Sequence, residues 1–248
     1  MVTEWDPATA RAAALTDAGK KRPGNEDAAA IADLANGSLL LAVADGVGGM
    51  GHGDMASAHA LQMLETLLRD GANPDAPKAL AAAFAQINRY IYDMGGDLEG
   101  RGTMASTLVA AVVQDGRAWL ASVGDSRAYL LRDGSLAQLT EDHSWVAEQL
   151  AAGAITAEEA ETSQYRHVIT RAMGVEETVE PQMVGPVDVP AGAALLLCSD
   201  GLYRVVTEPQ MAQELAKGAP QAICRQLVDL ANAGGGPDNI AVAVLKQP

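Results

Sequence analysis

The sequence predicts an α+β fold in which helices cover antiparallel β-sheets. Two-residue turn sequences occur at Asn36-Gly37, Asp115-Gly116 and Asp133-Gly134, each between apolar runs. Turns of this kind join adjacent antiparallel strands, whereas parallel strands need longer crossovers. The segments with strand character fall into groups, and the segments with helical periodicity lie between those groups, which is typical of α+β proteins. Because no repeat or low-complexity linker interrupts the pattern, residues 1–248 are predicted to form one domain.

The predicted strands are short apolar runs bounded by turn residues. They cover residues 11–19, 28–35, 38–44, 107–113, 118–123 and 127–131, with two later apolar runs at 194–198 and 240–245.

The predicted helices show apolar residues at intervals of three and four. They cover residues 54–69, 74–94, 207–217 and 220–232, with a further helical excursion at 144–162. The tandem glycines Gly95-Gly96 are expected to end the second helix, because glycine is the usual residue just past a helix C-terminus.

The composition is that of a soluble globular protein with a strongly acidic balance. Of the 248 residues, 48% are apolar and 20% are charged, and the formal net charge is −15. Such a charge disfavours nucleic acid and anionic membranes as partners. Two cysteines form no disulfide framework, and the first residues lack the pattern of a signal peptide. No apolar run reaches the roughly 20 residues of a membrane span. We therefore expect a cytoplasmic protein, acting as a monomer.

Acidic residues recur where apolar runs begin or end. Asp45-Gly46 ends the run that starts at Leu39, Asp200-Gly201 follows the run 194–198, and Asp238 precedes the run 240–245. Another acidic pair, Glu26-Asp27, precedes the first predicted hairpin. Carboxylates gather in a fold when a cation holds them together. The pattern therefore predicts an oxygen-lined site for hard divalent metals such as Mg²⁺ or Mn²⁺.

A two-metal site of this kind suits chemistry at phosphorus. Two ions about 4 Å apart can activate a shared water and clamp an in-line displacement. Asp45, Asp200 and Asp238 are the plausible side-chain ligands, together with the carbonyl of Gly46. Arg22 lies four residues before Glu26, and a guanidinium can bind two phosphoryl oxygens at once.

Other patterns have ordinary explanations. Asp115-Gly116 and Asp133-Gly134 are expected to be turns and nothing more. Asp125 lies in a hairpin motif that can be purely structural, and Arg22 can be solvated like the lysines before it. The histidines His143 and His167 suit a substrate-contacting or structural role better than metal ligation, because the site calls for oxygen ligands.

Cys198 and Arg204 have the spacing of a cysteine-dependent phosphatase signature, which would be a different enzyme class. In that class the loop between Cys and Arg cradles a dianion beside a low-pKa thiolate. Asp200 lies inside this loop and would repel both the dianion and the thiolate. Cys198 is therefore expected to be a buried neutral thiol.

In order along the chain, a set of motifs resembles the metal-dependent protein Ser/Thr phosphatases, the PPM or type 2C family, in their compact bacterial form. The matching stretches are Arg22-Pro23-Gly24-Asn25-Glu26-Asp27, Ala44-Asp45-Gly46-Val47-Gly48-Gly49 with Ala56-Ser57, Gly102-Thr103 with Ser106-Thr107-Leu108, Val123-Gly124-Asp125-Ser126-Arg127, Leu139-Thr140-Glu141-Asp142-His143-Ser144, Ile169-Thr170-Arg171-Ala172-Met173-Gly174, Ser199-Asp200-Gly201-Leu202 and Gly236-Pro237-Asp238-Asn239-Ile240. Each motif alone is weak evidence, but the full set in order is specific.

The resemblance implies a four-layer αββα sandwich of two antiparallel sheets, with a dinuclear metal site between them. It implies a phosphoprotein phosphatase that uses Mn²⁺ or Mg²⁺ to hydrolyse phosphoserine and phosphothreonine by attack of a metal-bridging hydroxide, opposing a bacterial Ser/Thr kinase. A non-catalytic phosphate-sensing or scaffold relative of the same fold is the alternative.

The resemblance also implies roles for particular residues. Asp45, Asp200, Asp238 and the Gly46 carbonyl would bind the two catalytic ions, and Arg22 would hold the phosphate. Glu26 and Asp27 would contact the metals through water, and Asp125 would help Asp200 to bind a third metal. Residues 144–167 would form a flap beside the site. At one position the chain departs from eukaryotic members, which have a His where Val47 stands; the acid for the leaving group is therefore unassigned, with metal-bound water as the expected donor.

Overall fold

The fold is built around two antiparallel sheets. The computed structural model describes residues 2–5, 11–35, 37–47, 52–69, 75–97 and 104–247. One sheet has the strand order β1-β2-β11-β10-β7-β8 and the other β3-β4-β5-β6-β9. The strands are β1 (Val2–Trp5), β2 (Arg11–Asp17), β3 (Asp27–Asp33), β4 (Leu39–Asp45), β5 (Leu108–Gln114), β6 (Arg117–Val123), β7 (Arg127–Arg132), β8 (Ser135–Gln138), β9 (Gln182–Asp188), β10 (Ala194–Cys198) and β11 (Ile240–Lys246).

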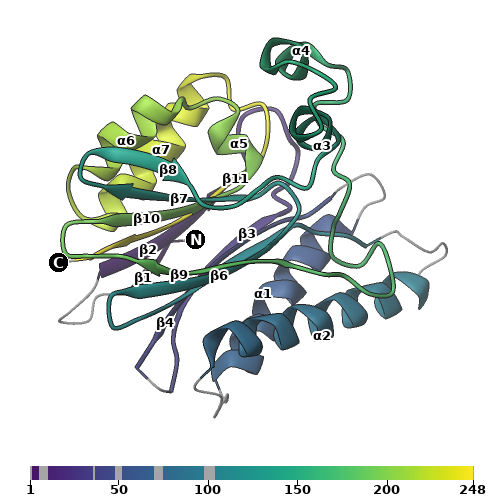
Figure 1. Ribbon diagram of the computed structural model, residues 1–248, viewed down its shortest axis with the longest axis horizontal. Helices are drawn as coiled ribbons and strands as arrows, with labels where there is room; N and C mark the ends of the chain where they lie inside the picture. The colour runs from purple at the N-terminus through teal and green to yellow at the C-terminus, as the bar shows by residue number, and fades with distance from the viewer. Residues whose placement is uncertain are drawn as a thin grey trace.

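Helices cover the outer face of each sheet, as Figure 1 shows. The helices α1 (Gly53–Arg69) and α2 (Ala76–Asp97) pack on the sheet that contains β4, and α6 (Glu208–Leu215) and α7 (Pro220–Ala233) pack on the sheet that contains β10. Three shorter helices are α3 (Trp145–Ala151), α4 (Ala157–Thr162) and α5 (Asp200–Tyr203). No helix in the described part of the chain is long and apolar enough to cross a membrane.

Three separate apolar clusters show that the layers are helix, sheet, sheet and helix. Along β4, Leu40 and Ala42 face the cluster under α1 and α2, whereas Leu41 and Val43 face the cluster between the sheets. Along β10, alternate residues face the inter-sheet cluster and the cluster under α6 and α7 in the same way. Successive strand residues point to opposite faces, so strands buried on both faces read as continuous apolar runs. The predicted four-layer αββα sandwich is confirmed.

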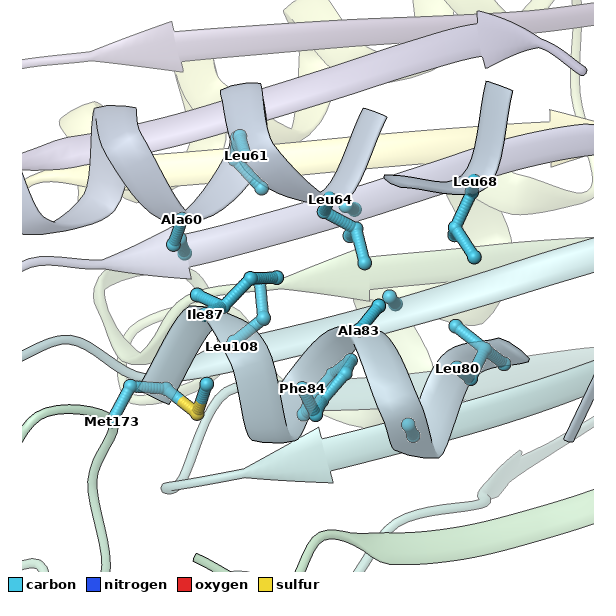
Figure 2. Packing of buried hydrophobic residues seen from close by; sticks show 14 of the residues in the cluster. Ala60, Leu61, Leu64, Leu68, Leu80, Ala83, Phe84, Ile87, Leu108 and Met173 are labelled. Atoms are coloured by element: carbon cyan, nitrogen blue, oxygen red, sulfur yellow. The ribbon is translucent and has the colours of Figure 1, made fainter. Parts of the chain in front are cut away.

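The helix pair α1 and α2 interlocks through small and branched side chains. Figure 2 shows the α1 residues Ala60, Leu64 and Leu68 facing the α2 residues Ile87, Ala83 and Leu80. Leu64 and Phe84 are completely buried. Burying a side chain of this size stabilises a fold by about 1.5–3 kcal/mol, so the burial of these side chains does more to hold α2 in place than helix propensity does.

The predicted hairpins form, although one has a longer connection than expected. Asp115-Gly116 and Asp133-Gly134 both have positive φ at each turn residue and join their strands as two-residue turns. The first hairpin, β3–β4, was predicted with the turn Asn36-Gly37, and Asn36 lies outside the described residues. In this hairpin Asp33 pairs with Leu39, and the Leu34 N–H donates to the Ser38 carbonyl. The connection is therefore longer than two residues.

Two other predictions are corrected or extended by the structure. The prediction that Gly95-Gly96 ends the second helix is wrong, because α2 continues through both glycines to Asp97. Glycine costs only about 1 kcal/mol inside a helix, less than the buried apolar contacts of α2 contribute. The predicted excursion at 144–162 contains α3 and α4, and each begins at a side-chain cap, Ser144 and Thr156 respectively. The strands β1 and β9 and the single turn of α5 were not predicted.

Candidate metal and phosphate site

A cavity of about 420 Å³ lies where the two sheets meet and collects residues from distant parts of the chain. Its lining consists of Arg22, Glu26, Asp45, Gly46, Val47, Thr107, Asp125, His167, Ile169, Asp200, Pro237, Asp238 and Asn239. Every candidate site residue from the sequence is in this set except Asp27. The motif residues Gly48, Gly49, Gly102 and Thr103 lie outside the described residues.

Asp45 ends β4, and its backbone is anchored to the neighbouring strand. Its N–H donates to Thr107 Oγ1 over 3.0 Å, and its carbonyl accepts from the Thr107 N–H over 2.8 Å. The next residue, Gly46, has no room for a side chain, because a Cβ there would lie 2.3 Å from the Gly53 carbonyl oxygen. The absence of a side chain at Gly46 therefore lets the start of α1 lie against the end of β4.

Asp27 is buried directly beside Asp45. The β3–β4 register pairs the two residues across the hairpin, so both side chains lie on the same face of the sheet. Burial, with the negative charge of Asp200, raises the pKa of Asp27 to about 7, although Ser199 Oγ donates to its carboxylate over 2.6 Å. Burial and the charge of Asp27 raise the pKa of Asp45 well above its ordinary value. This pair of carboxylates, one buried and one half-buried, calls for a positive charge beside it.

Asp200 and Asp238 come from the other sheet. Asp200 opens α5 immediately after β10, and Asp238 precedes β11. Burial and the charge of Asp125 raise the pKa of Asp200 to about 6. Each of the two carboxylates bonds an arginine: Arg22 lies 2.8 Å from Asp238, and Arg204 lies 2.8 Å from Asp200.

Asn239 holds the loop that carries Arg22 and Glu26 through hydrogen bonds. This role of Asn239 was not predicted from the sequence. The Asn239 side chain accepts from the Glu26 N–H and donates to the carbonyls of Ala18 and Gly24, all within 2.9 Å. Its position beside Asp238 in the motif was the available signal, because an amide can bond several backbone groups at once. Arg22 and Glu26 thereby lie near the start of β11.

Asp125 lies at the edge of the same cavity and is almost fully buried. The Tyr203 hydroxyl donates to its backbone carbonyl and its carboxylate, and Arg204 donates to the carboxylate over 3.2 Å. Burial raises the pKa of Asp125, and the charge of Arg204 opposes that rise. Neither Tyr203 nor Arg204 was singled out from the sequence as a partner of this acid.

The chemistry of this lining fits hard divalent cations. Glu26, Asp45, Asp125, Asp200 and Asp238 all reach the cavity, with Arg22 as the one strongly basic residue of the lining. In the described part of the chain, no three Asp, Glu, His or Cys side chains converge into a complete ligand set. Mg²⁺-like ions do not require one, because they bind one or two carboxylates and keep several waters. The residues therefore fit such ions by donor type and charge.

Comparison with known proteins shows which family the chain belongs to. The family described as Protein phosphatase 2C matches residues 20–227. The chain is a member of the protein phosphatase 2C family. The chain is 39% identical over 237 residues to the serine/threonine protein phosphatase PstP of Mycobacterium tuberculosis, and the matched region covers 94% of this chain and 44% of PstP. The chain thus spans less than half the length of that relative.

Solved structures of similar chains have the same fold as this 2C family member. The serine/threonine phosphatase of S. agalactiae superposes with a TM-score of 0.90 at 30% identity, covering 96% of this chain and 100% of that one. The catalytic domain of PstP in complex with 2 manganese ions superposes with a TM-score of 0.85 at 36% identity, covering 96% and 98% of the two chains. The predicted family is confirmed.

The alternative based on Cys198 has no support in the structure. The thiol is fully buried in the cluster under α6 and α7, and burial raises its pKa. It is absent from the lining of the cavity. A neutral buried thiol has no nucleophilic role here.

Proposed function

We propose that this chain is a Mn²⁺- or Mg²⁺-dependent phosphatase that hydrolyses phosphoserine and phosphothreonine in proteins. The observation that carries the proposal is that one cavity is lined both by Arg22 and by carboxylates next to strands of both sheets. Family membership supports the reaction, and the manganese ions in the PstP structure support the metal.

In this proposal Asp45, Asp200, Asp238 and the Gly46 carbonyl hold two catalytic ions, and Asp27 and Glu26 contact them through water. Asp125 joins Asp200 in holding a third ion. When bound, the ions would supply the acidity that activates water and the positive charge that stabilises phosphoryl oxygens. The raised pKa values of Asp27 and Asp200 support these assignments, because cations would relieve the repulsion among the acids.

Arg22 is the residue proposed to bind the phosphate. About half of its side-chain surface is exposed, so the guanidinium can turn from Asp238 toward a substrate. Its planar fork can bond two phosphoryl oxygens. The bonds of Asn239 to this loop keep the guanidinium near the acids, so the group that would bind phosphate is already positioned for the reaction.

A second cavity extends the site toward the segment 144–167, for which we use the name flap. It encloses about 720 Å³ and shares Asp125, His167, Asp200, Pro237 and Asp238 with the first cavity. Apolar side chains of α3 and α4 line its far side, among them Val146, Leu150 and Ala160. We propose that the protein segment around the phosphorylated residue lies in this cavity.

The proposed setting is the cytoplasm of a bacterium, where the chain acts as a monomer and opposes a Ser/Thr kinase. Bacterial Ser/Thr phosphatases such as the M. tuberculosis and S. agalactiae proteins support this assignment. Both cysteines, Cys198 and Cys224, are free and buried, as is usual in a reducing compartment. The net charge of −15 disfavours nucleic acid as a partner.

The test is hydrolysis of an aryl phosphate and a phosphothreonine peptide with Mn²⁺, with chelator, and after thiol alkylation. Activity that requires Mn²⁺ and survives alkylation is expected. Asp200→Asn should lose the most activity, whereas Asp133→Asn, in an exposed hairpin turn, should match wild type. Activity that survives the chelator would refute the proposal. Phosphopeptide binding without turnover would favour a non-catalytic, phosphate-sensing protein.

A further inference from the structure

Ser199 lies immediately before Asp200, and its hydroxyl group is not used in the way that its position in the chain predicts. It is the N-cap residue of α5, where a serine side chain ordinarily accepts a hydrogen bond from the first turn of the helix. The described residues of α5 donate no such bond to Ser199. The side chain is completely buried and is bonded instead to residues of both sheets.

The Ser199 hydroxyl belongs to a directed chain of two hydrogen bonds. Its oxygen accepts from the Ala241 N–H of β11 over 2.8 Å, and it donates to Asp27 Oδ2 over 2.6 Å. A hydroxyl has one proton, and a backbone N–H can only donate, so the Ala241 bond leaves the hydroxyl proton for the carboxylate. A separation of 2.6 Å is typical of a hydroxyl that donates to an ionised carboxylate.

The bond to Asp27 crosses from one sheet to the other. Ser199 follows β10 in the six-stranded sheet, whereas Asp27 begins β3 in the five-stranded sheet, and the two sheets face each other in Figure 1. Asp27 is only 7% exposed. Burying a charge is costly unless hydrogen bonds replace the lost water, so the hydroxyl supplies a bond that this carboxylate needs.

The orientation of the Asp27 carboxylate matters because Asp27 lies behind the cavity. It is absent from the lining, whereas Asp45, its partner across the β3–β4 hairpin, is present. In the proposed function Asp27 contacts the catalytic ions through water, and such a contact depends on where the carboxylate oxygens point. Because Ser199 holds Oδ2, it also fixes the direction of the other oxygen.

We propose that Ser199 is a positioning residue for the metal site, because its hydroxyl holds the Asp27 carboxylate in the orientation that contacts the catalytic ions through water. The inference rests on the proposed function, which assigns Asp27 to that site. Ser199 is itself absent from the lining of the cavity, so it acts through Asp27. Groups that orient the residues of a metal site typically contribute roughly 10–100-fold to metal affinity or activity.

The first measurement compares wild type with Ser199→Ala by equilibrium dialysis against Mn²⁺ and by hydrolysis of a phosphothreonine peptide in saturating Mn²⁺. Ser199→Ala should bind Mn²⁺ roughly 10–100-fold more weakly. Its kcat should fall while its KM for the peptide stays near that of wild type, because Asp27 is not assigned to the substrate. Ser122→Ala is the matched control: Ser122 is a buried serine of β6 whose hydroxyl donates to Gln182, and its variant should behave as wild type.

The second measurement repeats the Mn²⁺ dialysis in the background of Asp27→Ala. This background keeps the three proposed side-chain ligands, so its Mn²⁺ affinity should be weaker than that of wild type but measurable. If Ser199 acts through Asp27, adding Ser199→Ala to Asp27→Ala should cause no further loss, because residues that act as a unit are not additive. A merely structural serine would cause the same loss in both backgrounds, since its bond to Ala241 is present in both.

The outcomes separate this inference from the proposed function. Equal Mn²⁺ affinity in wild type and Ser199→Ala would overturn the inference, and so would a loss of the same size in the Asp27→Ala background. If wild type binds no Mn²⁺ and hydrolyses no phosphopeptide, the proposed function fails and the inference fails with it. Should Ser199→Ala not fold, Ser199→Cys replaces it, because a thiol is only a weak donor. Ser199→Cys should also bind Mn²⁺ more weakly than wild type, and wild-type affinity in this variant would overturn the inference.

Discussion

Asn239 offers the sharpest test of how the site is assembled, through the substitution Asn239→Ala. Asn239 is 6% exposed, and its side chain makes three hydrogen bonds to the backbone, at Glu26, Ala18 and Gly24. These bonds join the loop that carries Arg22 to the start of β11. The alanine variant removes all three bonds while leaving Arg22 and the acids in the sequence.

The expected loss of stability follows from these bonds. An intramolecular hydrogen bond contributes a net 0.5–1.5 kcal/mol or so, and a buried group left without a partner costs about 1–3 kcal/mol. Three bonds with partial access of water to the loop therefore correspond to about 2–4 kcal/mol in the free energy of unfolding. A loop that shifts by about 1 Å can also lower kcat/KM roughly 100-fold, because Arg22 would no longer face the reacting group.

The assay is urea unfolding in chelator together with kcat/KM in saturating Mn²⁺. Chelator removes the stabilisation that bound metal adds to the folded state. Asn232→Ala is the matched control, since Asn232 makes one side-chain bond, to Asp17, and its side-chain amide oxygen Oδ1 is buried without a partner. The control should lose about 1 kcal/mol or less and keep its activity.

Equal stability of the two alanine variants would refute the reasoning, because it would mean that the three bonds of Asn239 contribute nothing beyond one ordinary bond. Normal kcat/KM in a destabilised Asn239→Ala variant would refute the second part, namely that this amide positions Arg22.

Three further predictions concern metal, a buried hydroxyl and pH. Mn²⁺ at about 100 times its dissociation constant should raise the free energy of unfolding by about 2.7 kcal/mol, and a melting temperature that is unchanged by chelator would count against the site. Thr107→Val should lower stability by about 1–3 kcal/mol, because the Asp45 N–H loses its acceptor; a loss within the error of urea unfolding would contradict this. Burial, with the charge of Arg171, lowers the pKa of His143 to about 4 from 6.5, so the folded state binds fewer protons than the unfolded state between these values. The stability contributed by neutral His143 is therefore complete above about pH 6.5 and is lost as the pH falls toward 4. Melting curves of wild type and His143→Gln should show a stability difference that shrinks over that pH range. A constant difference would contradict the pKa shift.

Local signals predicted much of the fold. The turns at Asp115-Gly116 and Asp133-Gly134 require positive φ at both positions, and aspartate followed by glycine supplies it at low cost. The four-layer arrangement, in contrast, was expected from the family resemblance, since apolar periodicity does not show which faces meet. The prediction that Gly95-Gly96 ends the second helix failed because the tertiary packing of α2, in which Gly95 is buried, outweighed the low helix propensity of glycine.

The elements that sequence reasoning missed carry weak or contrary local signals. The strand β9 contains Gly185-Pro186, which reads as a break, yet it forms the edge of its sheet, where proline is tolerated. Its pairing with β6 is irregular between Ala118 and Leu120. The helix α5 has only 4 residues, too few for any periodicity to be seen. This short helix nevertheless places Asp200 and Arg204 in the lining of the second cavity, the one that extends toward the flap.

The register of the first hairpin shows why the acids could be predicted individually but their interaction could not. A two-residue turn at Asn36-Gly37 would pair Ala35 with Ser38 and therefore Asp27 with Gly46. The observed register instead places Asp27 opposite Asp45. A shift of one residue decides whether the two carboxylates share one face of the sheet or point to opposite faces. In this hairpin they share one face, so the charge of Asp27 adds to the desolvation of Asp45 in raising the pKa of Asp45, and the pair creates a demand for positive charge that a divalent ion can meet.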